Sequence, residues 1–182
     1  PIQSGASAGD VMTYDGSKIA LTAPAGGGLS TLVTLTSSTT WTIPAGVTTV
    51  RVIITGGGGS AGGTAGATAI KWISGLNPGS GISVTIGAGG SNYAAGGNSS
   101  FGSYVTANGG GGNGNTTPST ATGGDLNIVG GPRAETGTSN YYIGGVSYWG
   151  SAFYSGEGYG SGGGLINGSS GNGGPGVCVI EY

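Results

Sequence analysis

The stretch TANGGGGNGNTTPSTATGGDLNIVGG, from Thr106 to Gly131, decides the fold of this protein. It contains Gly runs at 109–112, 123–124 and 130–131, and similar runs recur at 56–59, 144–145, 162–164 and 173–174. Gly weakens a β-strand and supplies no side chain for packing, so an ordinary strand interpretation of residues 88–175 fails. The buried N–H and C=O groups of a compact chain must nevertheless find partners.

Extended threefold helices of the polyproline II type meet this need. They have no internal hydrogen bonds, so their N–H and C=O groups point sideways. With Gly at the inner positions, no Cβ holds neighbouring helices apart, and we predict a bundle of polyglycine II helices. The alternative is a flexible linker, which is typical of Gly/Ser-rich tracts. The aromatic residues within the tract and the strand that follows it argue against a linker.

The overall composition excludes several other classes of protein. Gly accounts for 47 of the 182 residues, charged residues make up 5 %, and the formal net charge is −2. Charge repulsion therefore does not keep the chain open. A collagen-like triple helix fails because Gly does not recur at every third residue. The four Lys and Arg residues are scattered, which argues against nucleic-acid binding, and no apolar run approaches the roughly 18 residues of a membrane span.

Residues 31–87 and the C-terminus predict a small β-scaffold. Val50, Val52 and Ile54 share one face of a strand, and Pro44-Ala45-Gly46 is a turn signal. The segments ATAIKWIS and ISVTIG are interpreted as a hairpin joined by LNPGSG. The final GVCVIEY is expected to pair with the 47–55 region. The predicted fold is mainly β: a small sandwich-like scaffold of antiparallel strands plus polyglycine-II-type helices, with no α-helix of note.

Two regions are expected. Residues 1–30 are rich in turns, with Asp15-Gly16 a candidate hairpin turn, and predict a stalk or connector. Residues 31–182 predict the Gly-rich domain. Because the chain opens with Pro, we expect it to be a fragment or a processed product. The single cysteine, Cys178, is expected to be a buried, unreactive side chain.

Several segments, in order, resemble the glycine-rich domain at the distal end of bacteriophage tail fibres. They are WTIPAGVTTVRVIITGGGGSAGG, KWISGLNPGSGISVTIGAGG, GGNSSFGSYVTANGGGG and GGPGVCVIEY, and the resemblance covers roughly residues 39–182. The layout is also similar to small adhesins at the fibre tips of contractile-tailed phages. There, Gly-rich motifs form a sandwich of polyglycine II helices, and the intervening loops select the host receptor. Residues 31–87 depart from that pattern by holding more β-strand.

The resemblance implies a viral protein at the distal end of a tail fibre, in the virion. It implies a function in attachment to a bacterial surface receptor, either a lipopolysaccharide glycan or an outer-membrane protein. The candidate recognition loops are 91–95, 113–122, 133–143 and 146–159. The rest of the fibre would be a partner. A homotrimer is expected because fibres are commonly threefold, and the alternative is a monomeric tip on a trimeric shaft. No nucleic acid or membrane insertion is expected.

Catalysis has little support in the sequence. The chain has no histidine, so Ser-His-Asp, Cys-His and His-based metal sites are excluded. Glycoside cleavage by paired carboxylates is the remaining enzymatic alternative, with Asp125, Glu135 and Glu157 as candidates. Three acidic residues in about a hundred do not by themselves indicate a catalytic pair. We therefore predict no enzymatic activity, no metal and no cofactor.

Seven aromatic residues between 140 and 164 predict a binding surface. Tyr and Trp bury a large area with little loss of conformational freedom, and they keep a polar group for hydrogen bonds. The predicted receptor-binding residues are Asn140, Tyr141, Tyr142, Tyr148, Trp149, Phe153, Tyr154, Glu157, Tyr159 and Asn167. Phe153 is the ring most expected to be internal, since it has no polar tip. The other interpretation of the chain is a structural protein, silk-like or ice-binding.

Trp41 and Trp72 are assigned to the core or scaffold, because both lie in alternating strands.

Overall fold

The computed structural model describes residues 11–14, 19–22, 31–136, 141–150 and 153–182. The described residues form sixteen β-strands and no α-helix, which confirms the predicted mainly β fold. The chain divides into two compact units, Pro1–Ser30 and Thr31–Tyr182. In the first unit, β1 (Val11–Tyr14) pairs antiparallel with β2 (Ile19–Thr22). The candidate turn at Asp15-Gly16 lies outside the described residues.

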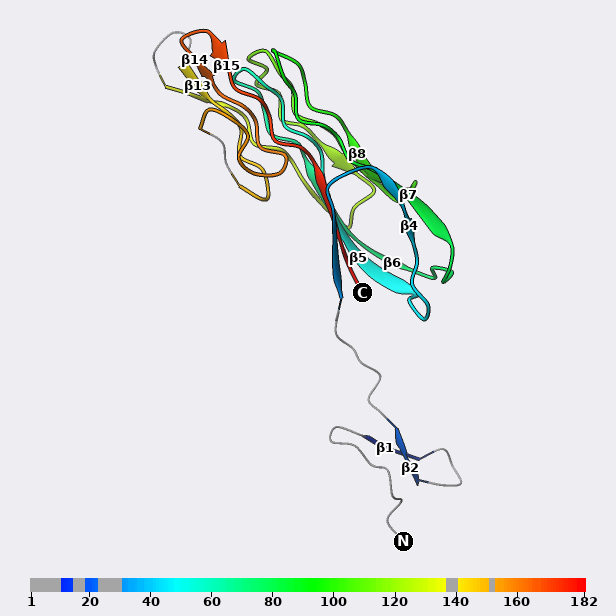
Figure 1. Cartoon of the computed structure of the whole chain (residues 1–182). Coiled ribbons are helices and arrows are strands. Elements are labelled where there is room, and N and C mark those ends of the chain that lie inside the picture. The colour runs from blue at the N-terminus through cyan, green and yellow to red at the C-terminus, as the bar shows by residue number, and fades with distance from the viewer. Residues whose placement is uncertain (1–10, 15–18, 23–30, 137–140, 151–152) are drawn as a thin grey trace. The chain divides into compact units, whose positions relative to one another are not determined.

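Two five-stranded antiparallel sheets form the scaffold of the second unit (Figure 1). The first has the order β11-β6-β5-β16-β3: β11 (Leu126–Ile128), β6 (Thr68–Ser74), β5 (Thr49–Thr55), β16 (Val177–Glu181) and β3 (Leu32–Leu35). The second has the order β10-β9-β8-β7-β4: β10 (Ala121–Thr122), β9 (Val105–Ala107), β8 (Ser99–Phe101), β7 (Gly81–Thr85) and β4 (Thr39–Thr42).

The core lies between these two sheets and contains apolar side chains from both. Val50, Val52 and Ile54 are fully buried on one face of β5, as their alternation predicts. From the other sheet, Val84 and Phe101 join the same cluster. This arrangement confirms the predicted sandwich-like scaffold.

The C-terminal strand closes the first sheet. β16 pairs with β5, with Ile180 opposite Val52, so the predicted return to the 47–55 region is confirmed. Cys178 is buried in the core, also as predicted, and burial raises the pKa of its thiol to about 12.

The predicted hairpin between ATAIKWIS and ISVTIG is wrong. β6 pairs with β5 and β11, whereas β7 pairs with β4 and β8, so the two strands belong to different sheets. The connecting turn is docked on the preceding loop, because Leu76 N donates to Thr48 O and Gly79 N donates to Ile43 O. Apolar and polar residues alternate in the same way whether the two strands pair with each other or lie in different sheets. The alternation therefore could not distinguish the two arrangements. The predicted turn at Pro44-Ala45-Gly46 is confirmed by a 3.2 Å hydrogen bond from Val47 N to Pro44 O.

The two scaffold tryptophans have different environments. Trp41 is 8 % exposed and belongs to the core, as predicted. Trp72 lies on β6 but is 53 % exposed, so its assignment to the core is wrong. Its side chain is on the outer face of the sheet, where the Arg51 guanidinium lies 5.7 Å from the ring centroid.

Beyond the sheets, the chain continues as Gly-rich segments bonded side by side. Residues 56–60, which follow β5, hydrogen-bond through the main chain to six other segments: 63–67, 87–90, 94–97, 108–112, 160–163 and 171–174. For example, Gly58 N donates to Gly174 O at 2.9 Å, and Gly110 N donates to Gly57 O at 2.8 Å. Six lateral neighbours around one extended segment are the arrangement expected of polyglycine II helices packed hexagonally. The predicted lateral bonding of the Gly runs is therefore present.

The spacing between these segments leaves no room for a side chain. A Cβ added at Gly58 would lie 1.9 Å from the carbonyl oxygen of Ser161, and one at Gly59 would lie 2.0 Å from that of Gly111. All residues from Gly56 to Ala69 are buried. The centre of the bundle is thus a set of close main-chain contacts in place of an apolar core.

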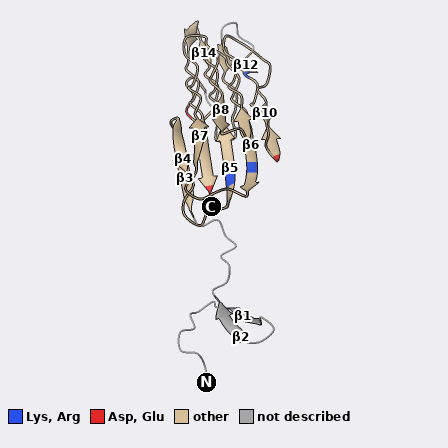
Figure 2. Ribbon diagram, turned by 90° about the vertical axis from the view of Figure 1, so that its right-hand side faces the viewer, with Lys and Arg blue, Asp and Glu red and all other residues tan. Residues whose placement is uncertain are grey.

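The bundle gives the second unit two different ends (Figures 1 and 2). At one end, which we call the scaffold end, Thr31 and Tyr182 exchange main-chain hydrogen bonds. At the other, which we call the turn end, the Gly segments reverse at 61–62, 91–93 and 113–115. A four-stranded sheet also lies there: β12 (Ala134–Glu135), β13 (Tyr141–Ile143), β14 (Leu165–Ile166) and β15 (Ser169–Ser170).

Candidate binding site

The four-stranded sheet at the turn end presents two faces with different roles. Residues paired across strands point to the same side of a sheet. Tyr141 pairs with Ile166, so these two share one face, and Ile143 lies on it as well. Tyr142 pairs with Leu165 and occupies the opposite face. We call these the outer and inner faces, because the inner face packs on the bundle.

Tyr142 attaches the sheet to the bundle. A Cβ at Gly62 would lie only 2.9 Å from the Cβ of Tyr142. Because Gly62 has no side chain, Tyr142 can pack directly against its main chain. The Arg133 guanidinium lies 3.9 Å from the Tyr142 ring centroid and is 2.9 Å from the carboxylate of Glu135. A cation over an aromatic ring is stabilising, more so where water is excluded. These contacts fix the position of the sheet.

Two adjacent hollows lie at this sheet, and residues of its outer face line both of them. The first, which we call the apolar hollow, has a volume of about 220 Å³ and is lined by Thr136, Tyr141, Tyr142, Ile143, Phe153 and Ile166. The second, which we call the polar hollow, has a volume of about 330 Å³ and is lined by Tyr154, Ile166, Asn167 and Ser169. Ile166 belongs to both, so the hollows are neighbours.

Main-chain bonds hold the rims of these hollows in place. Gly164 N donates to Tyr154 O at 2.7 Å, which fastens the loop that carries Phe153 and Tyr154 to β14. Asn167 and Gly168 have φ values of +51° and +78° and form the two-residue turn between β14 and β15. An Asn-Gly pair suits the left-handed conformation of such a turn.

Three of the predicted rings lie elsewhere. Tyr148, Trp149 and Tyr159 line a groove of about 400 Å³ on the outer face of the β11-β6-β5-β16-β3 sheet. Trp149 packs against the cluster of Ile53, Val177 and Val179 and donates a hydrogen bond to Thr55. Thus the seven rings form two groups instead of one surface, and Trp149 is part of the scaffold.

The remaining predicted site residues differ in their placement. Asn140 lies outside the described residues. Glu157 is exposed, but it does not line either hollow. Phe153 is 66 % exposed, so the prediction that it is the most internal ring is wrong. The structure therefore brings together Tyr141, Tyr142, Phe153, Tyr154 and Asn167.

Tyr93 is a residue at this end that the sequence-based selection did not include. Its hydroxyl donates a 3.0 Å hydrogen bond to the carbonyl of Gly168, which joins the 91–93 turn to the turn beside the polar hollow. Its φ of +67° is uncommon for an aromatic residue and is maintained by the surrounding structure. The sequence signal that could have identified Tyr93 was its position in a short turn between two Gly pairs. Ile143, Ile166 and Ser169 were also missed, because short β-strands among glycines give no clear alternation.

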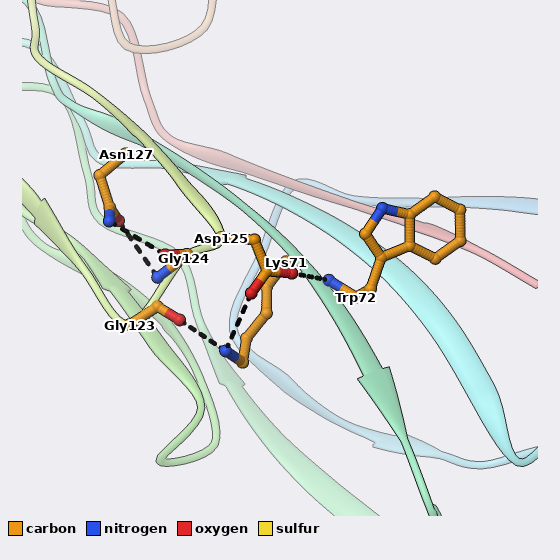
Figure 3. A network of polar contacts seen from close by, with 6 residues as sticks. All are labelled: Lys71, Trp72, Gly123, Gly124, Asp125 and Asn127. Atoms are coloured by element: carbon orange, nitrogen blue, oxygen red, sulfur yellow. Dashed lines mark hydrogen bonds and ion pairs between the residues drawn. The ribbon is translucent and has the colours of Figure 1, made fainter.

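Two of the three candidate catalytic carboxylates, Asp125 and Glu135, are engaged in separate structural contacts. Asp125 accepts a 2.8 Å hydrogen bond from Trp72 N and lies 3.6 Å from Lys71 Nζ, which itself donates to Gly123 O (Figure 3). The backbone hydrogen bond from Trp72, together with Lys71, holds the pKa of Asp125 below its ordinary value. A general acid in glycoside cleavage needs a raised pKa. Glu135 is paired with Arg133 in the sheet at the turn end.

Within the described residues there is no group of three or more His, Cys, Asp or Glu side chains suited to hold a metal ion. The same residues contain no helix of the length and apolar character needed to span a membrane. Comparison with protein-family models and with curated protein sequences finds no match for this chain.

Proposed function

We propose that residues 31–182 are the receptor-binding tip of a phage tail fibre, and that the turn end attaches to a bacterial surface receptor without cleaving it. The observation that carries the proposal is the group of aromatic residues on the outer face of the turn-end sheet. Tyr141, Phe153 and Tyr154 surround two hollows there. Aromatic residues above a rigid base are common tools of recognition.

The positions of the scaffold end and the turn end agree with this function. Thr31, the first residue of the unit, hydrogen-bonds to Tyr182 at the scaffold end. A fibre joined at Thr31 would therefore be attached at the end opposite the hollows. That arrangement leaves the turn end to face a host cell.

The rigidity of the bundle supports recognition as well. Loops that are already ordered lose little conformational freedom on binding, and this raises affinity. Here the rims of the hollows are fixed by main-chain hydrogen bonds such as Gly164 N to Tyr154 O. Binding without cleavage is proposed because Asp125 and Glu135 are each engaged with a cation, and the third candidate acid, Glu157, lines neither hollow. We further propose, from the resemblance to fibre tips, that three copies assemble, which a sedimentation mass would test.

The test is adsorption of the fluorescently labelled full chain to a panel of bacterial strains. We expect binding to a subset of strains, and loss of that binding in the double variant Tyr141→Ala, Phe153→Ala. The matched control is Tyr104→Ala, since Tyr104 is an exposed tyrosine of the turn between β8 and β9, in the scaffold. Absence of binding to every strain, or equal loss in the control, would contradict the proposal. Release of short oligosaccharides from bound cells would contradict the claim that nothing is cleaved.

A further inference from the structure

We infer that the two hollows at the turn end together bind one neutral glycan unit that carries an N-acetyl group. This inference rests on the proposed function and names the chemical class of its receptor. The sugar ring would lie in the polar hollow, beside Tyr154, Asn167 and Ser169. The acetyl methyl would enter the apolar hollow across Ile166, the residue that both hollows share.

The charge of the lining selects a neutral ligand. The residues that line the hollows are Thr136, Tyr141, Tyr142, Ile143, Phe153, Tyr154, Ile166, Asn167 and Ser169, and none of them is Lys, Arg, Asp or Glu. Arg133, whose guanidinium lies over the ring of the lining residue Tyr142, is paired with Glu135. An anionic sugar or a phosphate would therefore find no cation in either hollow to compensate its desolvation.

The polar hollow has the groups that sugar recognition requires. A pyranose ring has apolar C–H faces and a rim of hydroxyl groups. The ring of Tyr154, which is 36 % exposed, offers an apolar surface with a polar tip. The exposed Asn167 amide both donates and accepts hydrogen bonds, and the Ser169 hydroxyl does so too. Such groups match hydroxyls, which also act in both ways.

The apolar hollow accounts for the acetyl group. The exposed lining of this hollow is almost entirely apolar and includes Ile143 and Ile166. The Thr136 hydroxyl already donates to Tyr141 O at 2.9 Å. A sugar hydroxyl placed there would lose its hydrogen bonds to water without replacement. A methyl group would instead be removed from water without such a loss.

The size of the hollows favours a small ligand over a protein loop. Small-ligand pockets have volumes of about 300–1,000 Å³, and the hollows measure about 220 Å³ and about 330 Å³. A specific protein interface buries roughly 1,200–2,000 Å², far more surface than two hollows of this size offer. A protein receptor is therefore the alternative outcome of the test.

The direct test is binding of the full chain to an array of immobilised neutral and acidic glycans, followed by calorimetry. For the calorimetry we would use N,N′-diacetylchitobiose and N-acetylgalactosamine, with cellobiose as the control that lacks acetyl groups. We expect binding to be confined to N-acetylated neutral glycans, and at least about tenfold weaker for the matching sugar without the acetyl group. Binding to none of the arrayed glycans, or only to acidic ones, would overturn the inference.

Two variants separate recognition from folding. Asn167→Gly removes the amide but keeps a residue that tolerates the positive φ of this turn, and Ile166→Ala opens the wall between the hollows. We expect each to weaken glycan binding at least about tenfold, with the melting temperature of Asn167→Gly within about 2 °C of that of the unaltered chain. Tyr104→Ala is the control and should bind normally. Unchanged binding by Asn167→Gly would overturn the inference.

A cell experiment distinguishes this inference from the proposed function. Strains that adsorb the chain are treated with periodate, which oxidises sugar diols, or with a protease. Loss of adsorption after periodate alone supports the inference. Loss after protease alone overturns it and leaves attachment to bacteria intact. If no strain adsorbs the chain, the proposed function fails instead.

Discussion

Trp149 donates a hydrogen bond from its indole Nε1 to the Oγ1 of Thr55, 2.8 Å away and 94 residues earlier in the chain. Thr55 is the last residue of β5, directly before the first Gly run, and its hydroxyl also shares a 2.7 Å hydrogen bond with that of Thr68. The aromatic loop is therefore fastened to the point where the sheet becomes the glycine bundle. This contact explains why Trp149 does not belong to the group of rings at the turn end.

Replacing Trp149 should destabilise the protein without removing the binding site. In Trp149→Phe the Thr55 hydroxyl keeps its bond to Thr68 but loses the indole, and we expect a loss of about 1 kcal/mol. Urea unfolding followed by circular dichroism measures this. The control is Phe153→Ala, at a ring that is 66 % exposed, where we expect a change within about 0.5 kcal/mol. A larger effect at Phe153 than at Trp149 would contradict the assigned roles.

A methyl group in the centre of the bundle should prevent folding. The Cβ of Gly58→Ala would lie 1.9 Å from the Ser161 carbonyl oxygen, and main chain cannot move aside without breaking its own hydrogen bonds. We expect no cooperative unfolding transition in this variant. Gly46→Ala is the comparison, because its Cβ meets nothing within 4 Å and only its φ of +81° is unfavourable. That should cost roughly 1–2 kcal/mol. A folded Gly58→Ala variant would refute the close packing.

The buried thiol should make stability fall at high pH. Burial raises the pKa of Cys178 from 9.0 to about 12, so the folded state holds the thiol neutral while the unfolded chain ionises first. Its contribution is complete below pH 9 and is lost as the pH rises toward 12. The urea unfolding midpoint is measured for the protein and for Cys178→Ala, each at about pH 7 and about pH 10.5. Ionisation of the tyrosines affects both proteins alike, so the change with pH in the difference between their midpoints reports the thiol. A difference between the two proteins that does not change with pH would contradict the prediction.

Removing one oxygen atom from Tyr93 should weaken receptor binding. In Tyr93→Phe the ring stays and the hydrogen bond to Gly168 O is lost, which frees the Asn167 turn to move. Adsorption to a susceptible strain should fall several-fold, because ordering the turn then opposes binding. Tyr104→Phe is the matched control and should adsorb normally. If both variants adsorb equally well, Tyr93 has no positioning role.

The scaffold was predictable from the sequence where side chains alternate. The buried face of β5 and its pairing with β16 follow from Val50, Val52, Ile54 and the closing GVCVIEY segment. The partner of β6 was not predictable, because a strand with one apolar face alternates in the same way whichever strand lies beside it. The bundle followed from the need of the Gly main chain for partners, although the segment at the centre of the hydrogen-bond network could not be identified.

The site was predictable in composition but not in grouping. The aromatic-rich segment was recognised as a surface for binding, yet nothing in YWGSAFY separates Trp149, which packs on the scaffold, from Tyr154, which lies beside the polar hollow. Polarity alone misplaced Phe153, which is exposed. Tyr93 joins the site only through a main-chain carbonyl 75 residues away, and no sequence pattern records such a contact.

Amide hydrogen exchange of the Gly runs, followed by NMR, tests most directly the claim that lateral main-chain bonds make the glycine segments a rigid base. The amides of Gly58, Gly110 and Gly163 donate to Gly174, Gly57 and Gly59 at 2.9, 2.8 and 2.7 Å. We predict that they exchange as slowly as the Val52 amide in the centre of β5, because both open only with global unfolding. Exchange of these glycines at the rate of an unstructured peptide, with Val52 still protected, would contradict the account.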